Sequence, residues 1–138
     1  MMSARFYLMV SALSGLMSVV LGAFGAHGLK KVVSVDMLEA YQTGVQYQFI
    51  HSLVLLALAI VLLLPALNVS KALLSWSANL MMAGILLFSG SLYTMTLMSA
   101  ADGFPSWLGP ITPIGGLAFI MGWIFLLVAA FKLPIDEQ

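Results

Sequence analysis

The sequence contains no cysteine and very few charged residues. Only 7% of its 138 residues are charged, whereas an ordinary soluble domain carries about 25%. So few charges cannot keep a folded surface in water, which excludes a soluble enzyme. The lack of cysteine excludes disulfide bonds, thiolate metal sites and thiol nucleophiles. Five basic residues balance five acidic ones, and no basic run is longer than Lys30–Lys31, so we expect no nucleic-acid partner.

Long uncharged stretches make up most of the chain. Charges are absent between Arg5 and Lys30, Glu39 and Lys71, Lys71 and Asp102, and Asp102 and Lys132. Each gap exceeds the ~20 helical residues that cross ~30 Å of hydrocarbon. Lipid offers no partner for backbone polar groups, so runs this long must be helical, and the short alternating segments of membrane strands are missing. We predict an all-α integral membrane four-helix bundle, a single domain over 1–138, with transmembrane helices roughly at 6–26, 37–64, 71–98 and 113–131.

The first apolar stretch also fits a cleaved signal peptide, with Arg5 in front and Ala23–Gly25 as the cleavage site. It is longer than the ~7–15 apolar residues of such peptides, which favours a transmembrane helix. Small residues recur along it every three or four positions, a pattern typical of close helix packing in lipid. The predicted packing positions are Gly15, Ser18, Gly22, Gly90, Gly115, Gly116 and Gly122.

The second predicted helix has an unusually polar beginning. Asp36 and Glu39 resemble a capping box, which predicts a start near Met37. On a helical wheel, two polar arcs lie nearly opposite each other, and the deeper one should face the bundle interior because unpaired polar groups in lipid are costly. The shallow arc holds Glu39, Gln42, Thr43 and Gln46, and the deep arc holds Tyr41, Gly44, Gln48, His51 and Ser52.

Polar and small residues of the third predicted helix form a stripe against which the second helix could pack. It includes Ser75, Asn79, Gly90 and Thr94. A broken segment over 99–112 follows, in which Trp107 suits the membrane interface and Thr112, before Pro113, suits an N-cap. The candidate polar interior of the whole bundle is Tyr41, Gln48, His51, Ser52, Asn79, Ser89 and Tyr93.

Two histidines are the candidates for chemistry. A titrating His51 would serve as a proton relay or general base, whereas a neutral His51 bonded to a neighbouring helix would be structural, and the structural reading is favoured. His27, between Gly25 and Gly28, suits the end of the first helix. Scattered methionines without paired ligand motifs argue against a metal site, and no catalytic or phosphate-binding motif is present, so no metal and no cofactor are expected.

The basic residues give a small bias in orientation. With the N-terminus in the cytoplasm, Arg5, Lys71 and Lys132 lie inside, and Lys30 and Lys31 lie outside. The positive-inside rule therefore favours cytoplasmic termini in a multi-pass protein of the cell inner membrane.

Four ordered segments carry a resemblance to a known family. They are Gly22–Leu29, Tyr41–Ser52, Leu87–Tyr93 and Thr112–Phe119, the last followed by Gly122 and Trp123. With them the chain resembles the domain-of-unknown-function 423 family, small membrane proteins of the YgdD type. The resemblance covers nearly the whole chain and implies a four-helix inner-membrane protein, but it supplies no catalytic residue.

Three functions remain open at this point. The first is a non-catalytic bundle whose partners are the lipid bilayer and either further copies of itself or a larger membrane complex. The second is a small channel or transporter with a polar path lined by Gln48, His51 and Asn79. The third is a membrane-embedded enzyme acting on a lipid or quinone, with His51 as its base.

Overall fold

Four long helical spans make up the computed structural model of the chain, which describes residues 2–64, 69–101 and 103–133. The elements are α1 (Ala4–His27), η1 (Leu29–Lys31), α2 (Val35–Leu63), α3 (Lys71–Gly84), η2 (Ile85–Ser89), α4 (Gly90–Ser99), η3 (Ser106–Leu108) and α5 (Ile111–Phe131). The described residues contain no strand. All four spans are long and apolar enough to cross a membrane, which confirms the predicted all-α fold class.

The third span runs continuously from Lys71 to Ser99 but changes its winding in the middle. Between α3 and α4, η2 is a π-helical segment of five residues. Such segments are rare and are usually single wide turns within α-helices. Helix α5 approaches this segment closely, since a methyl group on Gly115 would overlap the backbone nitrogen of Phe88. The sequence alone predicts one uniform helix over 71–98.

The predicted helix starts need two corrections. The N-cap of α2 is Ser34, whose hydroxyl accepts a hydrogen bond from the Met37 amide at 3.3 Å, so the helix begins before the capping box predicted at Asp36. A serine hydroxyl caps a helix as well as an aspartate does, and Ser34 precedes Asp36 in the chain. Likewise, Thr112 does not cap α5, which begins at Ile111. The Thr112 hydroxyl instead pairs with that of Ser91, 2.7 Å away on α4.

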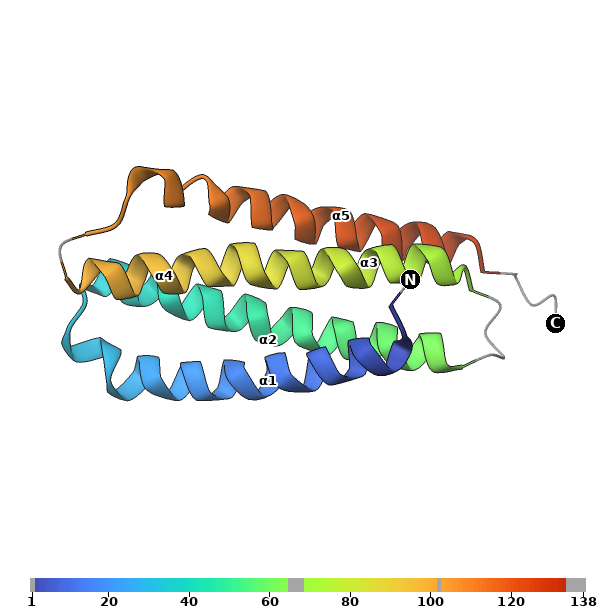
Figure 1. Cartoon of the computed structure of the whole chain (residues 1–138), viewed down its shortest axis with the longest axis horizontal. Helices are drawn as coiled ribbons and strands as arrows, with labels where there is room; N and C mark the ends of the chain where they lie inside the picture. The colour runs from blue at the N-terminus through green and yellow to red at the C-terminus, as the bar shows by residue number, and fades with distance from the viewer. Residues whose placement is uncertain (1, 65–68, 102, 134–138) are drawn as a thin grey trace.

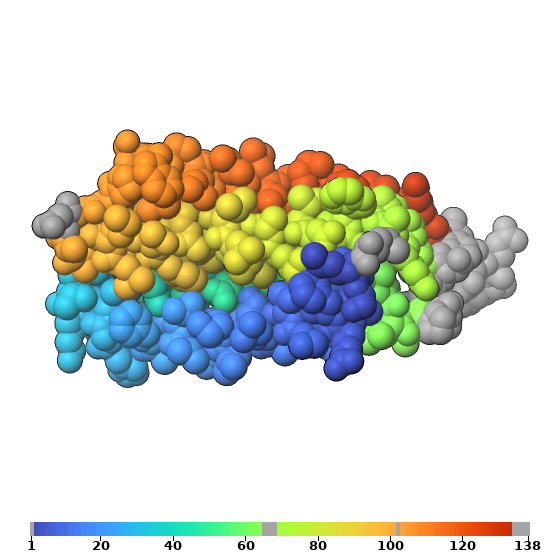
Figure 2. All heavy atoms as spheres, in the orientation of Figure 1, coloured from blue at the N-terminus to red at the C-terminus, as the bar shows by residue number. Residues whose placement is uncertain are grey.

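The helices follow one another across the molecule in the order α5, α3–α4, α2 and α1 (Figure 1). Helix α2 packs along α1 on one side and along α3, η2 and α4 on the other, while α5 packs along α3 and η2. In Figure 2, the middle of α2 is visible only as a strip between α1 and α4, because both lie in front of it. Helix α2 and the third span therefore lie between α1 and α5.

The apolar core lies where the four spans meet in the half of the bundle near the start of α1. Its fully buried side chains are Tyr7, Leu55, Leu58, Ala59, Leu74, Ala78, Met81, Phe119 and Ala129. The start of α1, the end of α2, the start of α3 and the end of α5 all lie at one end of the molecule (Figure 1). Arg5, Lys71 and Lys132 consequently share that end, and Lys30 and Lys31 lie at the other.

Candidate functional site

Side-chain hydrogen bonds join α1 to α2 along a buried polar interface, here called the α1–α2 seam. The Ser11 hydroxyl donates to the carbonyl oxygen of Ser52 at 2.9 Å, and the Ser52 hydroxyl lies 2.7 Å from that of Ser14. The Tyr41 hydroxyl donates to the carbonyl oxygen of Leu21 at 2.9 Å. Small serines allow this spacing because they let two helix backbones approach closely.

Gln48 links the seam to the third span. Its side-chain nitrogen donates to the carbonyl oxygen of Ser14 at 2.9 Å, and its side-chain oxygen accepts from the Tyr93 hydroxyl at 2.7 Å. The rings of Tyr41 and Tyr93 lie 5.0 Å apart. Gln48 is only 6% exposed, so an unpaired amide here would be costly. Both ends of the amide have direct partners, which makes the seam a closed network.

His51 lies on a different side of α2, facing α5. Its Nδ1 is 2.7 Å from the carbonyl oxygen of Tyr47, which can only accept, so Nδ1 carries the hydrogen. Its Nε2 therefore accepts, and Trp123 Nε1 donates to it at 3.3 Å. The ring also stacks on Phe119, with centroids 3.6 Å apart. Both nitrogens of a neutral imidazole are thus occupied, and neither is left to take a proton from a substrate.

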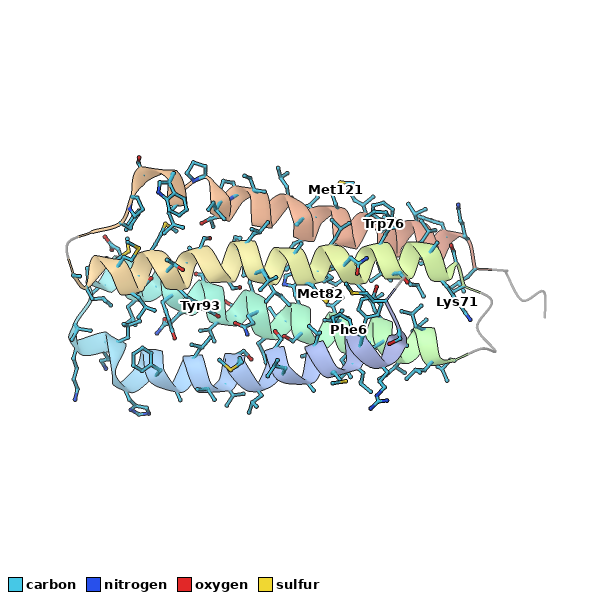
Figure 3. The ribbon with its side chains drawn as sticks, in the orientation of Figure 1. Phe6, Lys71, Trp76, Met82, Tyr93 and Met121 are labelled. Atoms are coloured by element: carbon cyan, nitrogen blue, oxygen red, sulfur yellow. The ribbon has the colours of Figure 1, made fainter. Side chains whose placement is uncertain are left out.

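Asn79 pairs with α1 rather than with α2. The Tyr7 hydroxyl donates to its side-chain oxygen at 2.9 Å. Phe6 and Met82, neighbours of this pair in sequence, lie between α1 and α3 on the same side of the molecule (Figure 3). The stripe predicted on the third helix therefore meets a tyrosine of the first helix, and Thr94, farther along it, is exposed.

The candidate polar path is not brought together. Gln48, His51 and Asn79 line three separate hollows: one between α1 and α3, one between α2 and α5, and one on α3. Of the other candidates, Tyr41, Ser52 and Ser89 are buried and Tyr93 is half-buried. The Ser89 hydroxyl, inside the π segment, has no hydrogen-bond partner among the described residues. His27 is the last residue of α1 and is exposed.

The predicted packing positions fall into two groups. An added methyl on Gly115 would meet backbone, one on Gly122 would come within 3.0 Å of Met81, and one on Gly22 would lie 3.4 Å from Val45. The Ser18 hydroxyl is buried and donates to the carbonyl oxygen of Gly15. By contrast, Gly15 and Gly90 have open space in the methyl position, and Gly116 has only an ordinary contact at 3.9 Å.

Two hollows that share Trp123 lie between α2 and α5, and together they are here called the α2–α5 groove. The hollow beside His51, here called the upper chamber, has a volume of about 530 Å³ and is lined by Tyr47, Phe119, Trp123 and Gln46 among others. The other hollow, here called the lower chamber, has a volume of about 410 Å³ and is apolar. The lower walls are Val54, Ala57, Leu58, Val61, Val69, Leu74, Leu126, Ala129, Ala130 and Leu133. Among the described residues no cluster of three or more His, Asp or Glu could hold a metal ion.

Several residues that build these contacts were not singled out by the sequence analysis. Tyr7 and Ser14 complete the polar pairs of α1, and Phe119 stacks on His51. Ser77 also joins α3 to α5 by donating to the carbonyl oxygen of Gly122 at 2.8 Å. A signal for the first two was present, since Tyr7, Ser11, Ser14 and Ser18 recur at helical spacing on one face of α1.

Comparison with known proteins gives a consistent result. The family described as proteins of unknown function, DUF423, matches residues 21–116. A UPF0382 membrane protein of Staphylococcus aureus is 40% identical over 93% of this chain and 97% of its own length. A UPF0382 membrane protein of Haemophilus influenzae is 46% identical over 91% of this chain and 94% of its own length. Another, from Schizosaccharomyces pombe, is 40% identical over 86% of this chain and 96% of its own length. No solved structure matches the chain.

Proposed function

Because the chain belongs to the DUF423 family of membrane proteins, whose description assigns no activity, we propose its function from its geometry. We propose that it is a non-catalytic, multi-pass bundle of the cell inner membrane. It assembles side by side with a larger membrane complex or with further copies of itself. The contact surface is the outward polar arc of α2, formed by Gln42, Thr43 and Gln46.

The observation that carries this proposal is the position of Gln46. Its side chain is exposed, and its amide makes no hydrogen bond to a described residue. Helix α2 has 29 residues, so at ~1.5 Å per residue it is about 43 Å long and exceeds the ~30 Å hydrocarbon core by about 13 Å. Gln46 lies about 16 Å from Val35, the first residue of α2. If all of the excess of about 13 Å lies on the Val35 side, the hydrocarbon begins about 13 Å along α2. Gln46, about 16 Å along the helix, still lies within it.

An amide at that depth is costly without a partner. Moving it from water into hydrocarbon costs several kcal/mol, whereas a hydrogen bond to another protein removes much of that cost. A shallow hollow of about 340 Å³ beside it, lined by Ser18, Gly22 and Gln42 among others, leaves room for an approaching helix. Polar groups that face lipid in this way support an interface in the membrane plane.

The two other functions have less support. A channel needs polar residues along one path, but Gln48, His51 and Asn79 line separate hollows and have protein partners. An enzyme with His51 as base needs a free ring nitrogen, and both nitrogens already have partners. We propose cytoplasmic termini because the end of the molecule with Arg5, Lys71 and Lys132 carries more basic residues than the other end.

Assembly is tested by replacing the outward amides. Gln46→Leu with Gln42→Leu should reduce the mass of the particle extracted from native membranes into polymer nanodiscs. Thr94→Val, a change at an exposed polar residue on α4, is the control and should leave the mass unchanged. A Gln46→Cys variant should form a disulfide-linked dimer on oxidation if the partner is a second copy. A wild-type particle with the mass of one chain would contradict the proposal.

A further inference from the structure

We propose that the groove between α2 and α5 binds a neutral lipid with a flat ring as its head and a long apolar tail, the chemistry of an isoprenoid quinone. The head occupies the upper chamber beside His51, and the tail follows the lower chamber toward Leu133. This goes beyond the proposed assembly, which uses the outward arc of α2.

The two chambers differ in a way that matches such a molecule. Flat rings line the upper one: Tyr47 and Phe88 have centroids 4.6 Å apart, and Phe119 and Trp123 complete the wall. Aromatic faces favour a planar ligand because offset stacking adds to the burial of its surface. The lower chamber has only aliphatic walls apart from the shared Trp123. From Trp123 to Leu133 it extends for roughly 15 Å at 1.5 Å per residue, enough for a linear tail.

The charge and depth of the upper chamber argue for a neutral head. The sequence has no Lys or Arg between Lys31 and Lys71, or between Lys71 and Lys132, so no cation of α2 or α5 is near it. His51 lies about 24 Å along α2 from Val35, close to the middle of the hydrocarbon. A phosphate or carboxylate head would be unpaired there and very costly to bury. A ring with carbonyl oxygens carries no such cost.

Two side chains that line the upper chamber can donate a hydrogen bond to a carbonyl oxygen, Tyr47 and Gln46. The Tyr47 side chain is 40% exposed, and its hydroxyl makes no hydrogen bond within the described residues. The His51 nitrogens are occupied, so His51 contributes its flat face and fixes Trp123 rather than donating to the ligand. Recognition of the carbonyl group is assigned to Tyr47, because Gln46 belongs to the contact surface of the proposed assembly.

The test uses the full chain in phosphatidylcholine nanodiscs, with Trp76→Phe and Trp107→Phe so that Trp123 is the only tryptophan. Decylubiquinone, a quinone with a saturated tail, is titrated while Trp123 fluorescence is recorded. We expect saturable quenching. Ala57→Phe, which fills the lower chamber from an exposed position, should raise the Kd about tenfold or more, a change of the size produced by losing a few buried methylene groups.

Two further variants make the result specific. Tyr47→Phe should raise the Kd about fivefold, as expected for one lost hydrogen bond. Ala12→Phe, at an exposed position of α1, is the matched control and should leave the Kd unchanged. Quenching that rises linearly without saturation, equally in Ala57→Phe and Ala12→Phe, would mean partition into lipid only and overturn the proposal. Displacement of the quinone by equimolar monoolein, which has no ring, would overturn the assignment of the head group.

Discussion

Helix α2 joins its neighbours in two different ways. Toward α1 it forms a seam in which Ser11, Ser14, Gln48 and Ser52 bond directly across the interface. Toward α5 it makes a single side-chain hydrogen bond, from Trp123 to His51, among the described residues, and a groove remains open. The contrast shows that a polar residue inside a membrane protein is not by itself a site. The closed seam holds the fold, and the space for a partner or ligand lies on the sides that are incompletely packed.

The position of α5 depends on glycine rather than on α2. Gly115 contacts the backbone of Phe88 in the π segment, and a methyl on Gly84 would overlap the Phe119 ring. These contacts keep α5 against the third span while the groove beside α2 stays open. The two sides of α2 can therefore be disturbed separately.

The largest effect is expected on the α5 side. Gly115→Ala places a methyl group into the Phe88 backbone, which cannot move aside as a flexible side chain would. We expect a loss of about 3 kcal/mol or more of unfolding free energy, the upper range for overpacking. Gly116→Ala is the matched control, since its methyl meets only an ordinary contact at 3.9 Å. Unfolding in mixed micelles by titration with SDS measures both, and equal stabilities would contradict the close approach of α5.

A smaller loss is expected in the seam. Gln48→Leu keeps the volume but leaves the Tyr93 hydroxyl and the Ser14 carbonyl without this partner. The unfolding free energy should fall by about 1–3 kcal/mol, the cost of leaving buried polar groups unpaired. Thr94→Val, a change at an exposed polar residue on α4, serves as the comparison and should change stability little. If the two variants were equally stable, Gln48 would not link the helices.

The smallest effect is expected across the groove. His51→Phe and Trp123→Phe each remove one partner of the single bond, and their double-mutant coupling energy should be about 0.6 kcal/mol, the average for such bonds in a membrane protein. The coupling is measured from the same SDS unfolding curves. A value above about 2 kcal/mol would show that α2 and α5 are held together as firmly as α1 and α2.

The sequence was sufficient for the fold but only partly for the contacts. Gaps between charges located four spans, and the helical wheel separated Gln46, which is exposed, from Gln48 and His51, which are buried. A helical wheel shows on which face a residue lies but not which helix covers that face. Only the structure shows that Asn79 pairs with Tyr7 and that Gln48 pairs with Tyr93. The π segment was not predicted, and its contact with Gly115 joins residues that lie far apart in the sequence.

Water accessibility distinguishes a closed seam from a polar path most directly. The chain has no cysteine, so Ser14→Cys, Gln48→Cys and Lys31→Cys each introduce a unique thiol. A small membrane-impermeant methanethiosulfonate reagent should label Lys31→Cys, which is exposed in η1, and leave Ser14→Cys and Gln48→Cys unmodified in folded protein. Rapid labelling of either buried position would contradict the closed seam and show that water reaches the centre of the bundle.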